Sequence, residues 1–183
     1  EAALEEVSEL LQAGELEWEA VEGWVDRGVV DPSTGVWKAA VDTVGSALEV
    51  GEIDWPKARE YIDTARNSSS HLVAGYSALA VAYGIRGDNV TWEQAEPILH
   101  ALRETQSKRQ AKVVVLIVAK LIDNEKITWE QAGEFILEAR ADDSAAVVEA
   151  AVKGIGYAVE NDQVNWENVA EHVTSIRDQH PPK

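Results

Sequence analysis

The chain has 183 residues, which is enough for one domain with a core of its own, and its 33 acidic residues against 16 Lys and Arg give a net charge of −17. Such acidity argues against binding to a phosphate backbone, so we expect no nucleic-acid partner, and the absence of cysteine excludes disulfides, thiol catalysis and thiolate metal sites. The four histidines are scattered along the chain, so we expect no metal and no cofactor. The longest strongly apolar run, 113–119, is far shorter than the roughly 20 residues that cross a bilayer. We therefore expect a cytoplasmic protein without a membrane partner.

One residue marks a repeat along the whole chain. Trp18, Trp55, Trp92, Trp129 and Trp166 are each separated by 37 residues, and a serine follows each of the first four after 15 residues, at Ser33, Ser70, Ser107 and Ser144. Thr91 with Gln94, and Thr128 with Gln131, have the spacing of a capping box, so each Trp is predicted to begin one helix (helix A). Each serine is predicted to cap a second one (helix B).

The repeats follow one another without a gap. Residues 1–16 form a half repeat, because Leu4, Val7 and Leu11 match Val41, Val44 and Leu48 in helix B. Four full repeats follow at 17–53, 54–90, 91–127 and 128–164, and residues 165–183 form a terminal half repeat. Apolar residues recur at helical spacing in both helices of each repeat, which predicts about 12 residues for helix A and about 17 for helix B. The whole chain, 1–183, is then one domain of about ten helices. Since Glu1 is not a methionine, we expect a piece of a longer protein.

A hairpin of two such helices cannot bury its apolar face alone, whereas stacked hairpins share a continuous core. We therefore predict an all-α fold, an α-solenoid of antiparallel two-helix repeats wound into a right-handed superhelix. The 37-residue period resembles the HEAT-like and armadillo-like superfamily, in architecture only and without a matching functional residue. That resemblance implies that helix B of each repeat lines the concave surface.

The recurring aromatic and cationic residues have structural interpretations. All seven Trp are predicted to lie in the core, including Trp24 and Trp37 outside the repeated column. An arginine stands eleven residues after four of the repeat Trp, at Arg66, Arg103, Arg140 and Arg177. We interpret them as helix-dipole and salt-bridge partners, with a row of cations for an acidic ligand as the alternative. Small residues at Gly45, Ala82, Ala119 and Gly156 predict close approach of another helix.

The outward face of helix B differs between repeats. Repeat 1 has small or polar residues there, Gly35, Ala39, Asp42, Thr43 and Ser46, as expected for a face that meets water. Repeats 2 and 3 have apolar residues at the same positions, next to the main cationic cluster of the chain. The candidate partner-binding residues are Leu72, Tyr76, Leu79, Tyr83, Arg109, Lys112, Val113, Leu116, Ile117, Lys120, Lys153 and Tyr157.

No nucleophile, base or phosphate loop stands out, so we expect no enzyme but a non-catalytic protein-interaction module or scaffold. Its partner would be a protein or peptide with apolar anchors and acidic flanks. The first alternative is a self-associating structural repeat domain, for example a homodimer. The second is an acidic nucleic-acid mimic, or a HEAT-like nucleic-acid enzyme resembling DNA-repair glycosylases. The acidity also resembles that of proteins from salt-in halophiles.

Overall fold

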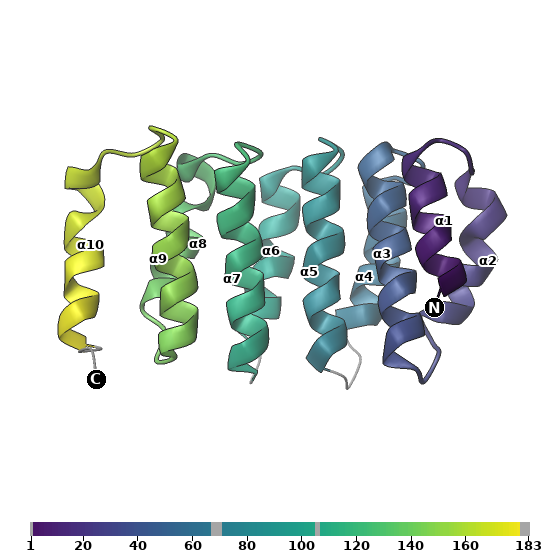
Figure 1. Cartoon of the computed structure of the whole chain (residues 1–183), viewed down its shortest axis with the longest axis horizontal. Helices are drawn as coiled ribbons and strands as arrows, with labels where there is room; N and C mark the ends of the chain where they lie inside the picture. The colour runs from purple at the N-terminus through teal and green to yellow at the C-terminus, as the bar shows by residue number, and fades with distance from the viewer. Residues whose placement is uncertain (1, 67–70, 105–106, 180–183) are drawn as a thin grey trace. The chain divides into compact units, whose positions relative to one another are not determined.

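The computed structural model describes residues 2–66, 71–104 and 107–179, and across these ranges it contains ten α-helices and no strand (Figure 1). The all-α prediction is confirmed. The helices are α1 (Ala2–Gln12), α2 (Trp18–Gly28), α3 (Thr34–Val50), α4 (Trp55–Arg66), α5 (His71–Arg86), α6 (Trp92–Arg103), α7 (Lys108–Asp123), α8 (Trp129–Arg140), α9 (Ala145–Glu160) and α10 (Trp166–Gln179).

The five predicted starts of helix A are confirmed, since α2, α4, α6, α8 and α10 each begin at the repeat Trp. Thr128 and Gln131 form the predicted capping box at α8, which satisfies two backbone N–H groups that the helix leaves free. Of the predicted serine caps, Ser107 accepts a bond from the Gln110 backbone N–H at 3.4 Å. Ser33 and Ser144 occupy the cap position without such a bond, and Ser70 lies outside the described residues.

Each turn from helix B to the next helix A contains one residue in the left-handed region of backbone space. Gly14 and Gly51 have φ of +70° and +80°, and Asp88, Glu125 and Asp162 have φ of 60°, 55° and 55°. These five positions are again 37 residues apart. Glycine adopts this conformation without steric cost, whereas Asp and Glu do so under mild strain.

Two compact units make up the chain, residues 1–102 and 103–183. In the first unit, α3 packs between α1 and α5, and α2 and α4 cover the other side of this row (Figure 1). The apolar residues of α3 and α4 that face this interface are fully buried, among them Val44, Leu48 and Ile62. Burial of such side chains is the main stabilising contribution to the unit.

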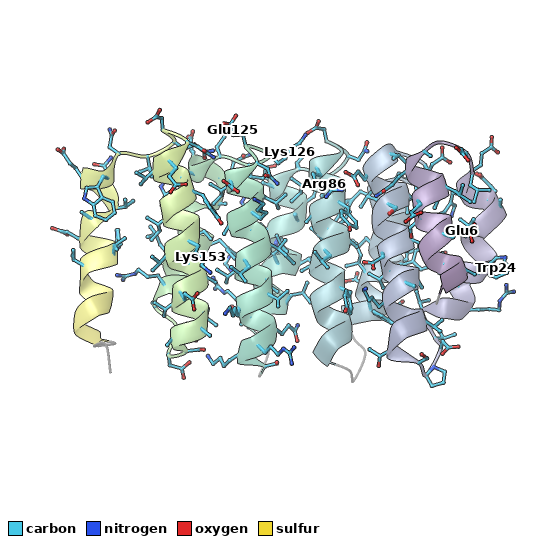
Figure 2. All side chains as sticks on the ribbon, viewed as in Figure 1. Glu6, Trp24, Arg86, Glu125, Lys126 and Lys153 are labelled. Atoms are coloured by element: carbon cyan, nitrogen blue, oxygen red, sulfur yellow. The ribbon has the colours of Figure 1, made fainter. Side chains whose placement is uncertain are left out.

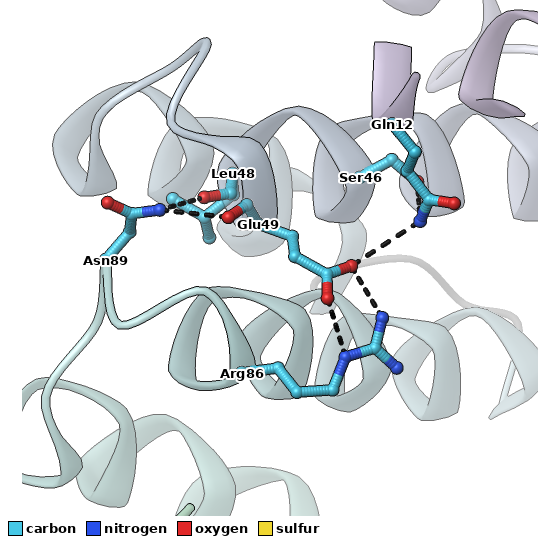
Figure 3. Close-up of polar contacts among 6 residues, drawn as sticks. All are labelled: Gln12, Ser46, Leu48, Glu49, Arg86 and Asn89. Atoms are coloured by element: carbon cyan, nitrogen blue, oxygen red, sulfur yellow. Dashed lines mark hydrogen bonds and ion pairs between the residues drawn. The ribbon is translucent and has the colours of Figure 1, made fainter. Parts of the chain in front are cut away.

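Polar side chains connect the B helices of the first unit (Figure 3). Arg86 of α5 binds Glu49 of α3 through its Nε, 2.7 Å from Oε1, and through its Nη2. Asn89 donates to the carbonyl of Leu48 at 2.9 Å, and Gln12 of α1 donates to Ser46 at 3.2 Å. The carbonyls at the end of α3 are thereby satisfied by the next turn.

In the second unit, α7 and α9 pack side by side, α8 contacts both, and α10 contacts α9. Phe135 and Ile136 of α8 are fully buried, as are Val115 and Ile122 of α7. Asn161 donates to the carbonyls of Ile122 and Asp123, so the end of α7 is capped as the end of α3 is.

The structural interpretation of the arginine column is supported at two positions. Arg103 donates to the carbonyl of Phe135 at 3.0 Å, and Arg140 donates to the carbonyl of His172 at 2.8 Å. Arg103 also forms an ion pair with Glu138 at 2.7 Å. The side chains of Arg66 and Arg177 lie outside the described residues.

Three sequence expectations need correction. Trp18, Trp37, Trp55 and Trp92 are buried, as predicted, and Trp129 is partly exposed, but Trp24 and Trp166 are 54% and 50% exposed. About half of each of these two side chains therefore remains in contact with water. The burial of a tryptophan in this chain thus depends on the helices that pack around it, and the residue type alone does not predict it.

The second correction concerns the outward face of helix B in repeat 1. Thr43 and Ser46 are buried and do not meet water, because α1 covers them. Ser8 and Thr43 share a hydrogen bond of 3.0 Å between their hydroxyl groups. The residues that we assigned to the outward face of repeat 1 therefore include two that pack on the preceding B helix.

The third correction concerns the column of small residues. A Cβ on Gly45 would overlap the Tyr83 ring, and a Cβ on Gly154 would lie 3.3 Å from the Cβ of Ala119, so Gly45 and Ala119 are places of close approach as predicted. A Cβ on Gly156, however, would meet nothing within 4 Å. Gly156 is therefore not a place of close approach within the described residues.

Candidate protein-binding surface

The candidate residues of the first unit lie on α5 and are partly used for packing. Tyr76, Leu79 and Tyr83 are partly exposed, and the side chain of Leu72 lies outside the described residues. The Tyr83 ring rests against Gly45 of α3 with the Arg86 guanidinium 4.5 Å from its centroid. Burial raises the pKa of Tyr83, with Asp42 acting in the same direction. Tyr83 therefore has a role in joining α5 to α3.

The candidate residues of the second unit form one surface on α7 and α9, which we call the α7–α9 face. It consists of Arg109, Lys112, Val113, Leu116, Ile117, Lys120, Lys153 and Tyr157. Val113 is 37% exposed, and Leu116 and Ile117 are partly exposed on the same helix. The opposite side of α7 supplies the core residues Val115, Val118 and Ile122. The helix is therefore apolar on both sides, and the apolar surface of Val113, Leu116 and Ile117 remains partly exposed to water.

The lysines of this face form ion pairs with two carboxylates, Glu149 and Asp123. Glu149 lies between the two helices, with an oxygen 3.1 Å from Lys153 Nζ on α9 and another 4.0 Å from Lys112 Nζ on α7. Lys120 pairs with Asp123, and its Nζ lies 5.9 Å from the centroid of the Tyr157 ring. The spacing i,i+4 between Glu149 and Lys153 was the signal in the sequence that would have revealed this pair.

These ion pairs change the electrostatics of the face. Lys153, and then Lys112, hold the pKa of Glu149 below its usual value, and Asp123 raises the pKa of Lys120. The face contains four cations, Arg109, Lys112, Lys120 and Lys153, and two carboxylates, Glu149 and Asp123, pair with the three lysines. The face remains a cationic region in a chain whose net charge is −17. All these pairs are exposed to solvent, so we expect them to exchange readily with the charges of a ligand.

No three His, Asp or Glu side chains among residues 2–66, 71–104 and 107–179 are arranged to hold a metal ion. In the same part of the chain, no helix has the length and apolar character needed to cross a membrane. No protein-family model matches the sequence, and no curated protein matches it.

Proposed function

We propose that the chain is a protein-interaction module built as an α-solenoid of antiparallel two-helix repeats with a period of 37 residues. Several features that recur at that interval support the repeat architecture: the Trp at each start of helix A, the left-handed residue in each turn, and the bonds that Arg103 and Arg140 make to the following helix A. A stack of such repeats presents one continuous surface of B helices to a ligand.

The ligand is a segment of another protein, and it binds to the α7–α9 face without chemical conversion. The observation that carries this proposal is the exposed apolar group Val113, Leu116 and Ile117 within a rim of cations. An apolar patch with a charged rim is typical of interaction sites, in which buried anchors supply the affinity and rim charges affect orientation and association rate. The ligand that fits is a helical or extended segment with apolar anchors and acidic flanks.

Two exposed valines provide a matched test. Val113 on the face and Val50 at the end of α3 are 37% and 43% exposed, so Val113→Asp and Val50→Asp make the same change at similar exposure. A displayed library of random peptides is selected on the native chain, and the enriched peptides are then bound to both variants. We expect apolar residues next to Asp or Glu in those peptides, and loss of binding by Val113→Asp alone.

Circular dichroism and light scattering accompany this experiment, so that folding and oligomeric state are known for each variant. Peptides that bind the native chain and Val113→Asp equally would exclude the face as their site. A change of oligomeric state caused by Val113→Asp would instead assign the face to self-association, and the proposal would be wrong.

A further inference from the structure

Glu149 is an acidic residue within the cationic α7–α9 face. On α9 it is followed at intervals of four residues by Lys153 (labelled in Figure 2) and Tyr157, so these three side chains line the same side of the helix. The helices α7 and α9 pack side by side (Figure 1), and Lys112 of α7 approaches Glu149 from the neighbouring helix. The Glu149 carboxylate therefore lies between two cations that belong to different helices.

Glu149 does not satisfy the two lysines equally. One of its oxygens lies 3.1 Å from Lys153 Nζ, which is a hydrogen-bond distance, whereas the other lies 4.0 Å from Lys112 Nζ. The Lys112 ammonium is therefore attracted by this carboxylate without being hydrogen-bonded to it. Two positive charges share one negative charge, so the pair of lysines retains a surplus positive charge and N–H donors for a second acid.

The two lysines border the apolar residues of the face. Leu116 is four residues after Lys112 on α7, so these two side chains are neighbours on the helix surface. A ligand residue that covers Leu116 also removes water from around Lys112, and interactions between charges become stronger where water is removed. An acidic ligand residue beside the apolar one therefore meets Lys112 and Lys153 where its charge contributes most to binding.

We propose that Lys112 and Lys153 form a subsite for one Asp or Glu side chain of the protein ligand, and that Glu149 fills this subsite in the free chain. The ligand carboxylate replaces Glu149 between the two ammonium groups. The exchange costs little, because Glu149 is 57% exposed and an exposed i,i+4 ion pair is weak. Glu149 thus lowers the affinity for an acidic ligand residue and leaves that for a neutral one unchanged. This inference rests on the proposed function, since it requires a protein segment bound to the α7–α9 face.

The test uses a peptide selected from the displayed library on the native chain, together with versions in which each Asp or Glu is replaced in turn by Asn or Gln. Fluorescence anisotropy gives the dissociation constants of these peptides for the native chain, Glu149→Gln and Glu22→Gln. Glu22 is the matched control, because it pairs with Lys57 at 2.7 Å between α2 and α4 of the other unit. Either substitution reduces the net negative charge of −17 by one.

Glu149→Gln is expected to bind the acidic peptide about two- to fivefold more tightly than the native chain does, because the competing carboxylate is absent. One acid of the peptide is responsible for this gain: once it is replaced by its amide, Glu149→Gln and the native chain should bind equally. Glu22→Gln should leave every dissociation constant unchanged. Lys153→Gln should weaken binding of the acidic peptide by a similar factor and leave binding of the amide version unaffected. The substituted side chains are exposed, so folding should be retained, and circular dichroism checks it.

A gain in affinity that is the same for every version of the peptide would show that Glu149 acts through the structure of α9, and the subsite would be excluded. Equal gains for Glu149→Gln and Glu22→Gln would assign the effect to net charge and would also exclude it. A peptide that depends on Val113 but has no acid that responds to Glu149→Gln would overturn the subsite alone. A library that yields no peptide dependent on Val113 would overturn the proposed function and the subsite together.

Discussion

The Tyr61 ring meets the Trp18 ring edge-on at a centroid distance of 5.7 Å and an interplanar angle of 68°. This contact joins two A helices that are consecutive in the repeat, α2 and α4. Aromatic pairs in this geometry add about 0.5–1.5 kcal/mol beyond the area that they bury. Trp18 therefore has two functions: it begins α2, and it provides a surface on which α4 packs.

A buried and an exposed Trp should differ strongly in their contribution to stability. Trp92 is 4% exposed, and Trp92→Ala is expected to lower the free energy of unfolding by about 3–5 kcal/mol through lost packing. Trp24→Ala, measured at low protein concentration, should cost less than about 1 kcal/mol. Urea denaturation followed by circular dichroism measures both. Equal losses would mean that Trp24 is covered within the single chain.

The left-handed turn residues Gly51 and Glu125 occupy equivalent positions, and we expect substitutions there to change the free energy of unfolding in opposite directions. A Cβ on Gly51 would meet only the Asn89 side chain, at 3.7 Å, so Gly51→Ala acts through the positive φ. Strain of about 1–2 kcal/mol, less the gain from the lower entropy of the unfolded chain, should leave a net destabilisation of about 0.5–1 kcal/mol. Glu125→Gly removes the same strain and should be stabilising, by about 0.5 kcal/mol after the greater entropy of the unfolded chain is subtracted.

Glu125→Gln serves as the control, because it removes the charge and keeps the strain. A free energy of unfolding that is the same for Glu125→Gly and Glu125→Gln would show that charge, not backbone conformation, explains any gain.

Tyr61 gives the stability of the chain a defined dependence on alkaline pH. Burial, followed by the hydrogen bond to Asp26, raises the pKa of Tyr61 from 10.0 to about 12. Between these values the unfolded chain loses the proton that the folded chain keeps, so the stabilisation present below pH 10 is lost as pH rises towards 12. Tyr61→Phe should show a smaller decline over this interval in urea denaturation. An identical decline would assign the alkaline transition to other groups, such as Tyr83, whose pKa is also raised.

The helix positions could be predicted from the sequence because their signals are local. A Trp after a capping residue, and apolar residues at helical spacing, define each start without knowledge of the neighbours. The left-handed turn residue was missed, since glycine marks it at Gly14 and Gly51 but Asp88, Glu125 and Asp162 hide it in the later turns.

Burial and ion pairing could not be predicted in the same way. Trp24 and Trp166 occupy positions at which aromatic residues are buried elsewhere in the chain, yet both are about half exposed. The cationic rim was recognised, but the partners of Lys112 and Lys120 depend on helix packing and side-chain geometry. The sequence thus identifies the lysines but not the carboxylates with which they pair.

The most direct test of the proposed binding function is the affinity of one selected peptide for three chains: native, Val113→Asp and Val50→Asp. Fluorescence anisotropy with a labelled peptide gives the three dissociation constants under identical conditions. Burying an unpaired carboxylate at an apolar contact should weaken binding at least tenfold, or about 1.4 kcal/mol, for Val113→Asp, with Val50→Asp within twofold of the native chain. Equal dissociation constants for Val113→Asp and Val50→Asp would contradict a binding role for the α7–α9 face.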